Sequence, residues 1–180
     1  MLKTVLLLIM KIHETAFITS TYRSSYKDIS KDIYAHLWNN STTDTLILQI
    51  LENISKHEPL LHCLRNRFFY ERIKVFFSNN TNGIFINFGA GFSMYQFIMN
   101  ETISTIEIDK TDIIEHKKEK VDFWVKKRKL PKRNVAYISM DLTSCTEQEI
   151  LQSLQPIIKK QPTFIVSGTI GRSWNANVRT

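Results

Sequence analysis

The second half of the chain carries four short apolar strings that are rich in β-branched residues. These strings are Ile84 to Phe88, Thr102 to Ile108, Val135 to Met140 and Thr163 to Val166. Short apolar runs bounded by polar turn residues are typical of buried strands. The segments between the last three strings have helical patterning, with Thr143 or Ser144 as the predicted cap of the last helix. Strands that alternate with helices predict βαβ units, and therefore an α/β fold with a parallel sheet.

The first eighty residues have the periodicity of helices instead. Residues 43–54 place their large apolar side chains on one helical face, residues 24–40 predict a short aromatic helix, and residues 65–77 predict another amphipathic helix. The apolar run from Val5 to Met10 is short for the core of a signal peptide and too short to span a membrane. We therefore expect a buried N-terminal segment and no membrane partner.

Composition is that of one globular domain. Apolar residues make up 43% of the 180 residues, which is ample for a core. The two cysteines, Cys63 and Cys145, lie far apart and have no histidine or cysteine at metal-ligand spacing. This pattern favours free thiols in a reducing compartment, such as the cytoplasm, over a disulfide or a metal site.

The net charge of +7 is concentrated in one window. Between His116 and Arg133 there are nine basic residues and two acidic ones, so this window alone equals the whole excess. Because the rest of the chain is balanced, we expect a solvated basic helix end rather than a nucleic-acid-binding face. The run from Lys126 to Arg133 also resembles a nuclear localisation signal, which keeps a nuclear location as the alternative.

Two of the five glycines, Gly89 and Gly91, lie two positions apart directly after the first apolar string. In a doubly wound sheet, ligands bind outside the carboxyl ends of the central strands, and glycine lets the backbone approach them. The turn therefore indicates a dinucleotide site or an S-adenosylmethionine (SAM) site, with a tightly packed turn as the structural alternative. The dinucleotide fingerprint needs a third glycine where this chain has Met94, which weakens the dehydrogenase hypothesis.

Two carboxylates follow on the second string. Glu107 and Asp109 lie 18 and 20 residues after Gly89, and the alternation of a strand puts both on one face. Both ligand classes need a carboxylate here to accept hydrogen bonds from ribose hydroxyls. Acidic residues at strand ends are also common as solvated turn residues. The two carboxylates therefore indicate a ligand site only in combination with the glycine turn.

Several motifs stand in a fixed order along the chain. Thr15 and Ala16 are followed by DIYAHL at 32–37, RNRFFYERI at 65–73, INFGAGF at 86–92, IEIDKTDIIEHKKE at 106–119 and MDLTS at 140–144. Over residues 14–168 this ordered set resembles the leucine carboxyl methyltransferase family. The resemblance implies a Rossmann-like, SAM-dependent methyltransferase fold, with a helical region at 1–82, a SAM-binding half with four strands at 83–170, and an irregular tail at 171–180.

The resemblance also implies a set of cofactor-binding residues. They are Arg67, Gly89, Ala90, Gly91, Glu107, Asp109, Asp141 and Leu142. The arginine would pair with the SAM carboxylate through its bidentate fork. The glycine turn would lie beneath the methionine moiety, one of the two strand carboxylates would bind the ribose, with Asp109 as the first candidate, and the Asp-Leu pair would contact the adenine. An ordinary surface arginine and a helix-capping aspartate are the structural alternatives.

The implied reaction is methyl transfer from SAM to a carboxylate or hydroxyl oxygen. A carboxylate is already ionised at neutral pH, so the reaction needs no general base, and we assign no catalytic side chain. The acceptor would be either a protein C-terminal carboxylate or a small-molecule acid. The five histidines are scattered along the sequence, and we expect them to be structural or exposed.

The chain departs from the family pattern in three places. Ser93 stands where the family commonly has an aspartate, and Ser167 precedes Gly168 where the family usually has a glutamate. The family sheet has about seven strands, whereas four are predicted here, so we expect the C-terminal strands to be missing. These departures give the alternative of a catalytically inactive or truncated methyltransferase-fold protein that serves as a binding module.

Overall fold

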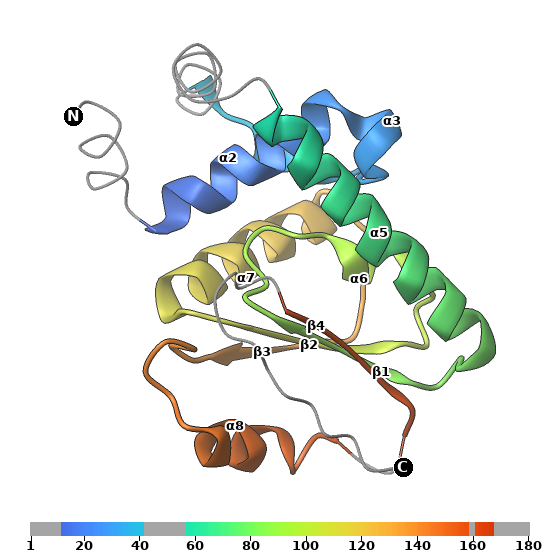
Figure 1. Cartoon of the computed structure of the whole chain (residues 1–180), viewed down its shortest axis with the longest axis vertical. Coiled ribbons are helices and arrows are strands. Elements are labelled where there is room, and N and C mark those ends of the chain that lie inside the picture. Colours follow the sequence, from blue (N-terminus) through green and yellow to red (C-terminus); the bar gives the residue numbers. More distant parts are fainter. Residues whose placement is uncertain (1–11, 42–56, 159–160, 168–180) are drawn as a thin grey trace.

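Four parallel strands form the centre of the structure, a computed structural model that describes residues 12–41, 57–158 and 161–167 (Figure 1). The strands are β1 (Ile84–Phe88), β2 (Ser104–Asp109), β3 (Val135–Ser139) and β4 (Thr163–Ser167). Their order is β3-β2-β1-β4, and every neighbouring pair is parallel. The α/β class, the parallel sheet and the four predicted strands are confirmed, with small shifts at the strand ends.

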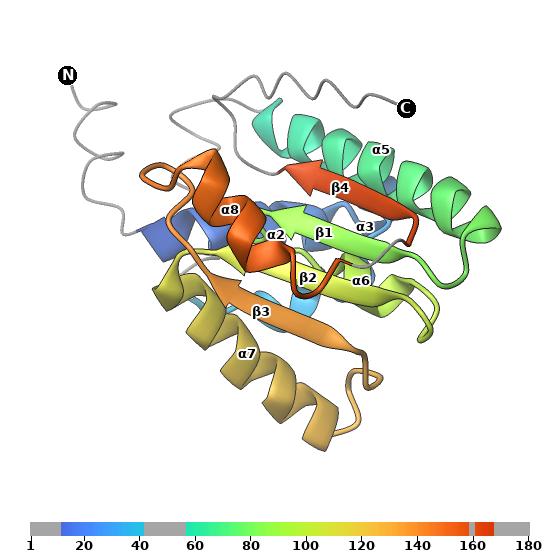
Figure 2. The same cartoon turned by 90° about the horizontal axis from the view of Figure 1, so that it is seen from below.

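Helices cover both faces of this sheet. One face carries α5 (Glu58–Asn79), α6 (Tyr95–Ile98) and α7 (Thr111–Lys126), and the other carries α8 (Glu147–Leu154) (Figure 1). Figure 2 shows β4 at one edge beside α5 and β3 at the opposite edge beside α7. Because all strands are parallel, their carboxyl ends meet at the same end of the sheet, where the glycine turn lies.

Each face of the sheet has its own core. On the α8 face a cluster is made of Ile84, Ile86, Ile106, Ile108, Ile150 and Leu154. On the α5 face Phe85 packs with Ile73 and Phe77 of α5. The central strands β1 and β2 are thus buried on both faces, which explains why they stand in the sequence as continuous apolar strings rather than alternating ones.

The N-terminal helical region is confirmed for the described residues. It consists of α2 (Ile12–Ser25), α3 (Lys27–Ser30) and the 3-10 helix η1 (Ala35–Trp38), followed by α5. The ring of Trp38 stacks on Phe92 with centroids 4.0 Å apart, which fixes η1 against the segment after the glycine turn. This packing places α2 and η1 over the carboxyl end of the sheet.

Two details of this region differ from the predictions. The single helix over 24–40 is wrong, because Lys31 adopts a left-handed conformation with φ of 60° and ends α3. Helix α2 has no predicted counterpart, because hydroxyl residues dilute its apolar periodicity. These hydroxyls bond back to carbonyls of the previous turn, as Thr21 Oγ1 does to Phe17 O at 3.0 Å. The predicted helix at 43–54 and the N-terminal segment lie outside the described residues.

Helix α8 begins with a capping box. Thr146, and not the predicted Thr143 or Ser144, is the N-cap: its hydroxyl accepts from Glu149 N at 3.3 Å, and its own N–H donates to Glu149 Oε2 at 2.7 Å. We expect Thr146→Ala to lower the free energy of unfolding by about 1 kcal/mol, because a helix N–H loses its acceptor. Urea unfolding measures this, with Gln148→Ala in the same helix turn as the control that should change little.

Candidate functional site

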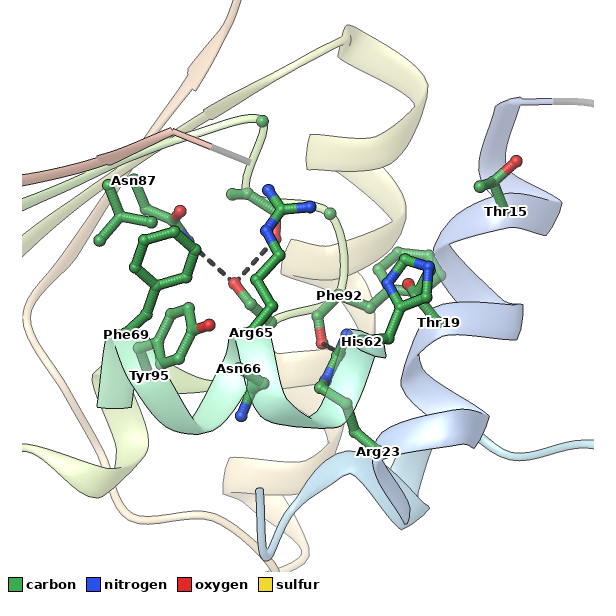
Figure 3. A pocket seen from close by; sticks show the side chains of 15 residues that line it. Thr15, Thr19, Arg23, His62, Arg65, Asn66, Phe69, Asn87, Phe92 and Tyr95 are labelled. Atoms are coloured by element: carbon green, nitrogen blue, oxygen red, sulfur yellow. Dashed lines mark hydrogen bonds between the residues drawn. The ribbon is translucent and has the colours of Figure 1, made fainter. Parts of the chain in front are cut away.

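A cavity of about 280 Å³ lies at the carboxyl end of β1, between the glycine turn and helices α2 and α5 (Figure 3). The turn contributes Gly89, Ala90 and Gly91, and α5 contributes His62 and Arg65. The sheet therefore places its glycine turn where ligands bind in open α/β folds.

The glycine turn requires the backbone freedom of glycine. Gly89 and Gly91 have φ of 63° and 45°, in the left-handed region that other residues rarely adopt. The N–H groups of Gly89 and Ala90 both donate to Ile108 O of β2, at 2.9 and 3.2 Å. Gly91 N donates to Asp109 Oδ2 at 2.7 Å. The start of the turn is thus fastened to the end of β2.

Asp109 stands at the junction of three strand ends. Its Oδ1 accepts from Lys110 N at 2.8 Å, its Oδ2 accepts from the turn, and its carbonyl accepts from Met140 N at 2.8 Å. The carboxylate is half-buried and lies behind the cavity wall rather than in it. Such a group orients the turn and keeps lone pairs for a ligand hydroxyl.

Glu107 is placed differently from Asp109. Its side chain is fully buried, and its Oε1 accepts from Lys117 Nζ of α7 at 2.8 Å. Burial raises the pKa of Glu107 and lowers the pKa of Lys117, and in each case the charge of the partner opposes the shift. Glu107 is therefore part of an internal ion pair, and Lys117 is an exception to the solvated basic window expected between residues 116 and 133.

Arg67 lies outside the cavity. Its side chain is 45% exposed and pairs with Glu71 one helical turn later, with 2.7 Å between Nε and Oε1. Residues two positions apart on a helix point in nearly opposite directions, so Arg65, not Arg67, lines the cavity. Figure 3 shows the side chain of Arg65 extending from α5 toward the loop that follows β1.

Asp141 and Leu142 follow β3 and do not line the cavity. Asp141 is exposed and accepts from Thr143 N at 3.0 Å and Thr143 Oγ1 at 2.7 Å, and these hydrogen bonds lower its pKa. Its carboxylate also lies 3.4 Å from Lys110 Nζ. Leu142 is half-buried against the isoleucine core on the α8 face. The pair thus stands at the same end of the sheet as the glycine turn, next to Asp109.

Arg23 and His62 line the cavity and are not among the predicted site residues. Arg23 of α2 pairs with Asp32 and donates to Phe92 O at 2.9 Å. His62 lines the cavity, with Nε2 3.8 Å from Glu58 Oε1, and burial is the main cause that lowers its pKa. His62 and Arg65 are three residues apart in the sequence, and this spacing could have predicted that they lie on the same face of a helix.

The described cavity wall carries the guanidinium groups of Arg23 and Arg65, and none of the described lining residues is acidic. Arg23 is paired with Asp32, and burial lowers the pKa of His62. The remaining wall includes the hydroxyls of Thr15 and Thr19, the ring of Phe69 and the amide of Asn87. An anionic group on a partly apolar ligand suits this composition, since Arg65 can offer a forked pair of donors.

Comparison with known proteins adds no assignment: no protein-family model matches the chain, and no curated protein matches it. Among the described helices, none is long and apolar enough to cross a membrane. Over the same residues, no group of three or more histidine, cysteine, aspartate or glutamate side chains could hold a metal ion.

Proposed function

We propose that this protein is a SAM-dependent O-methyltransferase of the leucine carboxyl methyltransferase type. The observation that carries the proposal is the cavity in which Arg65 lies across from the glycine turn of residues 89–91, with Asp109 fastened behind that turn. The four-stranded parallel sheet with a helical region before it supports the proposal, because the sequence resemblance implies a Rossmann-like methyltransferase fold of this kind.

The residues present fit SAM, with one change from the expected set. The cofactor carries a carboxylate at its methionine end, and Arg65 takes the role that the resemblance gave to Arg67. The turn of Gly89, Ala90 and Gly91 would pass beneath the methionine moiety. Asp109 is the better ribose ligand because Glu107 is engaged with Lys117 inside the protein. Asp141 and Leu142 remain proposed contacts of the adenine, next to Asp109 at the strand ends.

When bound, SAM supplies a methyl group on a positively charged sulfur. The chain's own residues would hold and orient the ligands and exclude water from them. The arginines of the cavity wall would attract an acceptor carboxylate, and the apolar side chains would reduce its hydration. Because a carboxylate is ionised at neutral pH, positioning rather than proton transfer would dominate catalysis. The acceptor would be a protein C-terminal carboxylate or a small-molecule acid, and a hydroxyl acceptor is the alternative.

Arg65 and Arg67 form a matched pair for a binding test. We expect Arg65→Ala to raise the dissociation constant for S-adenosylhomocysteine about 10- to 100-fold, because a charge-assisted hydrogen bond to the ligand carboxylate is lost. Arg67→Ala removes the same side chain from the exposed side of the helix and should leave the dissociation constant unchanged. Isothermal titration calorimetry measures both, and equal effects of the two substitutions would contradict the assignment of Arg65.

The function itself is tested by titrating the unmodified protein with S-adenosylhomocysteine and, separately, with NAD⁺. Micromolar binding of the first alone supports the SAM site. Absence of S-adenosylhomocysteine binding by the folded chain contradicts it. The second candidate, a binding module without catalysis, is favoured by Ser167 at the end of β4, where the family usually has a glutamate. Cofactor binding without methyl transfer to carboxylic acids or C-terminal peptides would select this candidate.

A further inference from the structure

Two buried ion pairs flank the segment that leaves the glycine turn. One joins Lys117 of α7 to Glu107 of β2 at 2.8 Å, and neither side chain is exposed. The other joins Arg23 of α2 to Asp32 at 2.9 Å, with side-chain exposures of 9% and 4%. The two pairs come from separate parts of the chain, one from the N-terminal helical region and one from the sheet and its helix.

Each cation makes a second hydrogen bond, and the two acceptors are consecutive carbonyls. Arg23 Nη2 donates to Phe92 O at 2.9 Å, as Figure 3 shows, and Lys117 Nζ donates to Ser93 O at 2.7 Å. Phe92 and Ser93 directly follow Gly91. The turn is therefore fastened at its start by β2 and Asp109, and at its end by cations from two different helices.

Stability alone does not account for these cations. Replacing a buried ion pair by apolar side chains of similar size is often neutral or stabilising, because the charges no longer lose their hydration. An apolar pair, however, has no donor for the carbonyls of Phe92 and Ser93. Arg23 and Lys117 therefore supply hydrogen bonds to the main chain that apolar side chains could not make.

We propose that Arg23 and Lys117 are positioning residues that hold residues 91–93 in the conformation that binds ligand. The proposal rests on the cofactor site described above. A turn that is already ordered loses less conformational freedom when a ligand binds, so the hydrogen bonds of the two cations to the turn raise cofactor affinity in addition to any contact that Arg23 makes in the cavity. They act through the backbone of the glycine turn.

The experiment compares two variants that remove a cation together with its partner. These are Lys117→Met with Glu107→Gln, and Arg23→Leu with Asp32→Asn, so that no unpaired charge is left inside. The control is Lys118→Met on the exposed side of α7, which removes a lysine of the same helix that does not contact the turn. Each protein is titrated with S-adenosylhomocysteine, and amide hydrogen exchange of residues 91–94 is measured without ligand.

We expect each double variant to weaken S-adenosylhomocysteine binding by about tenfold or more and to speed exchange at the turn, since each loses a charge-assisted hydrogen bond. The Lys118→Met control should stay within about threefold of the unmodified protein, because exposed substitutions have small effects. Double variants that fold, bind equally well and exchange at unchanged rates would overturn the proposal.

Two further arms keep the outcomes distinct. If the unmodified protein binds no S-adenosylhomocysteine, the proposed function fails, and the exchange rates alone decide whether the cations hold the turn. If the Arg23 and Asp32 double variant does not fold, Arg23→Lys replaces it: lysine keeps the charge beside Asp32 but lacks the second arm that reaches Phe92 O. Faster exchange at the turn in this variant supports positioning, and unchanged exchange contradicts it.

Discussion

Replacing Lys117 alone with methionine should lower the free energy of unfolding by about 3–5 kcal/mol, because Glu107 is then left as an unpaired charge in the interior. This is the largest stability effect that we expect from a single substitution in the described residues. Chemical unfolding at neutral pH measures it. The matched control is Lys118→Met: the neighbouring lysine is exposed, and its loss should change the free energy of unfolding by less than about 0.5 kcal/mol.

The pH dependence of the Lys117→Met variant gives the sign of the effect. Burial already raises the pKa of Glu107, and the positive charge that opposes this shift is gone in the variant. The folded state then holds a proton more tightly than the unfolded state does, so the stability of the variant falls as the pH rises above the ordinary glutamate range. The deficit relative to the unmodified protein should be smaller at about pH 5 than at about pH 8. A deficit independent of pH would mean that Glu107 is not left charged inside.

Asp109→Ala should weaken binding of S-adenosylhomocysteine about 10- to 100-fold, because the ribose loses a charged acceptor and Gly91 N loses its partner. Isothermal titration measures the loss. Asp109→Asn separates the two causes, since an amide oxygen can still accept from Gly91 N but carries no charge. We expect Asp109→Asn to lie between the alanine variant and the unmodified protein.

Glu115→Ala is the control for Asp109→Ala. Glu115 is an exposed carboxylate on α7, so its removal changes the net charge equally without touching the turn. Binding within about twofold of the unmodified protein is expected, because exposed substitutions away from special features have small effects. Equal losses in the two variants would mean that Asp109 acts through overall charge and not through its place behind the turn.

The sheet was predictable because its signal is local. Each strand is a short apolar string with polar turns on both sides, and the burial of β1 and β2 on both faces removes the alternation of polar and apolar residues from those two strands. The glycine turn was predictable for a similar reason. Two glycines close together at the end of a strand indicate a turn with positive φ, and Gly89 and Gly91 both adopt positive φ. Helix α2 was missed because its serine and threonine hydroxyls bond to their own helix and obscure the apolar face.

The site was predicted less well where orientation decides the role. Arg65 and Arg67 belong to the same sequence motif, and the sequence alone does not distinguish their roles. The orientation of α5 places Arg65 in the cavity wall and Arg67 in a surface ion pair with Glu71. Lys117 sits within a run of basic residues that are otherwise mostly exposed, so nothing in the sequence marks it as buried. Its place depends on Glu107, which in turn depends on the register of β2 beneath α7. Such long-range partners follow from the assembled fold and not from spacing.

The pairing of β1 with both β2 and β4 has a consequence for the order in which the protein folds. β1 and β2 are close in the sequence and can pair early, whereas Ile84 meets Thr163 only after most of the described chain has been made. Val166 of β4 also lines the cavity, so the ligand-binding wall is completed last. Pairings between residues that are distant in the sequence form slowly. A ligand that binds this cavity therefore stabilises the chain only in the state in which β4 is paired with β1, and its binding free energy is added to that long-range pairing.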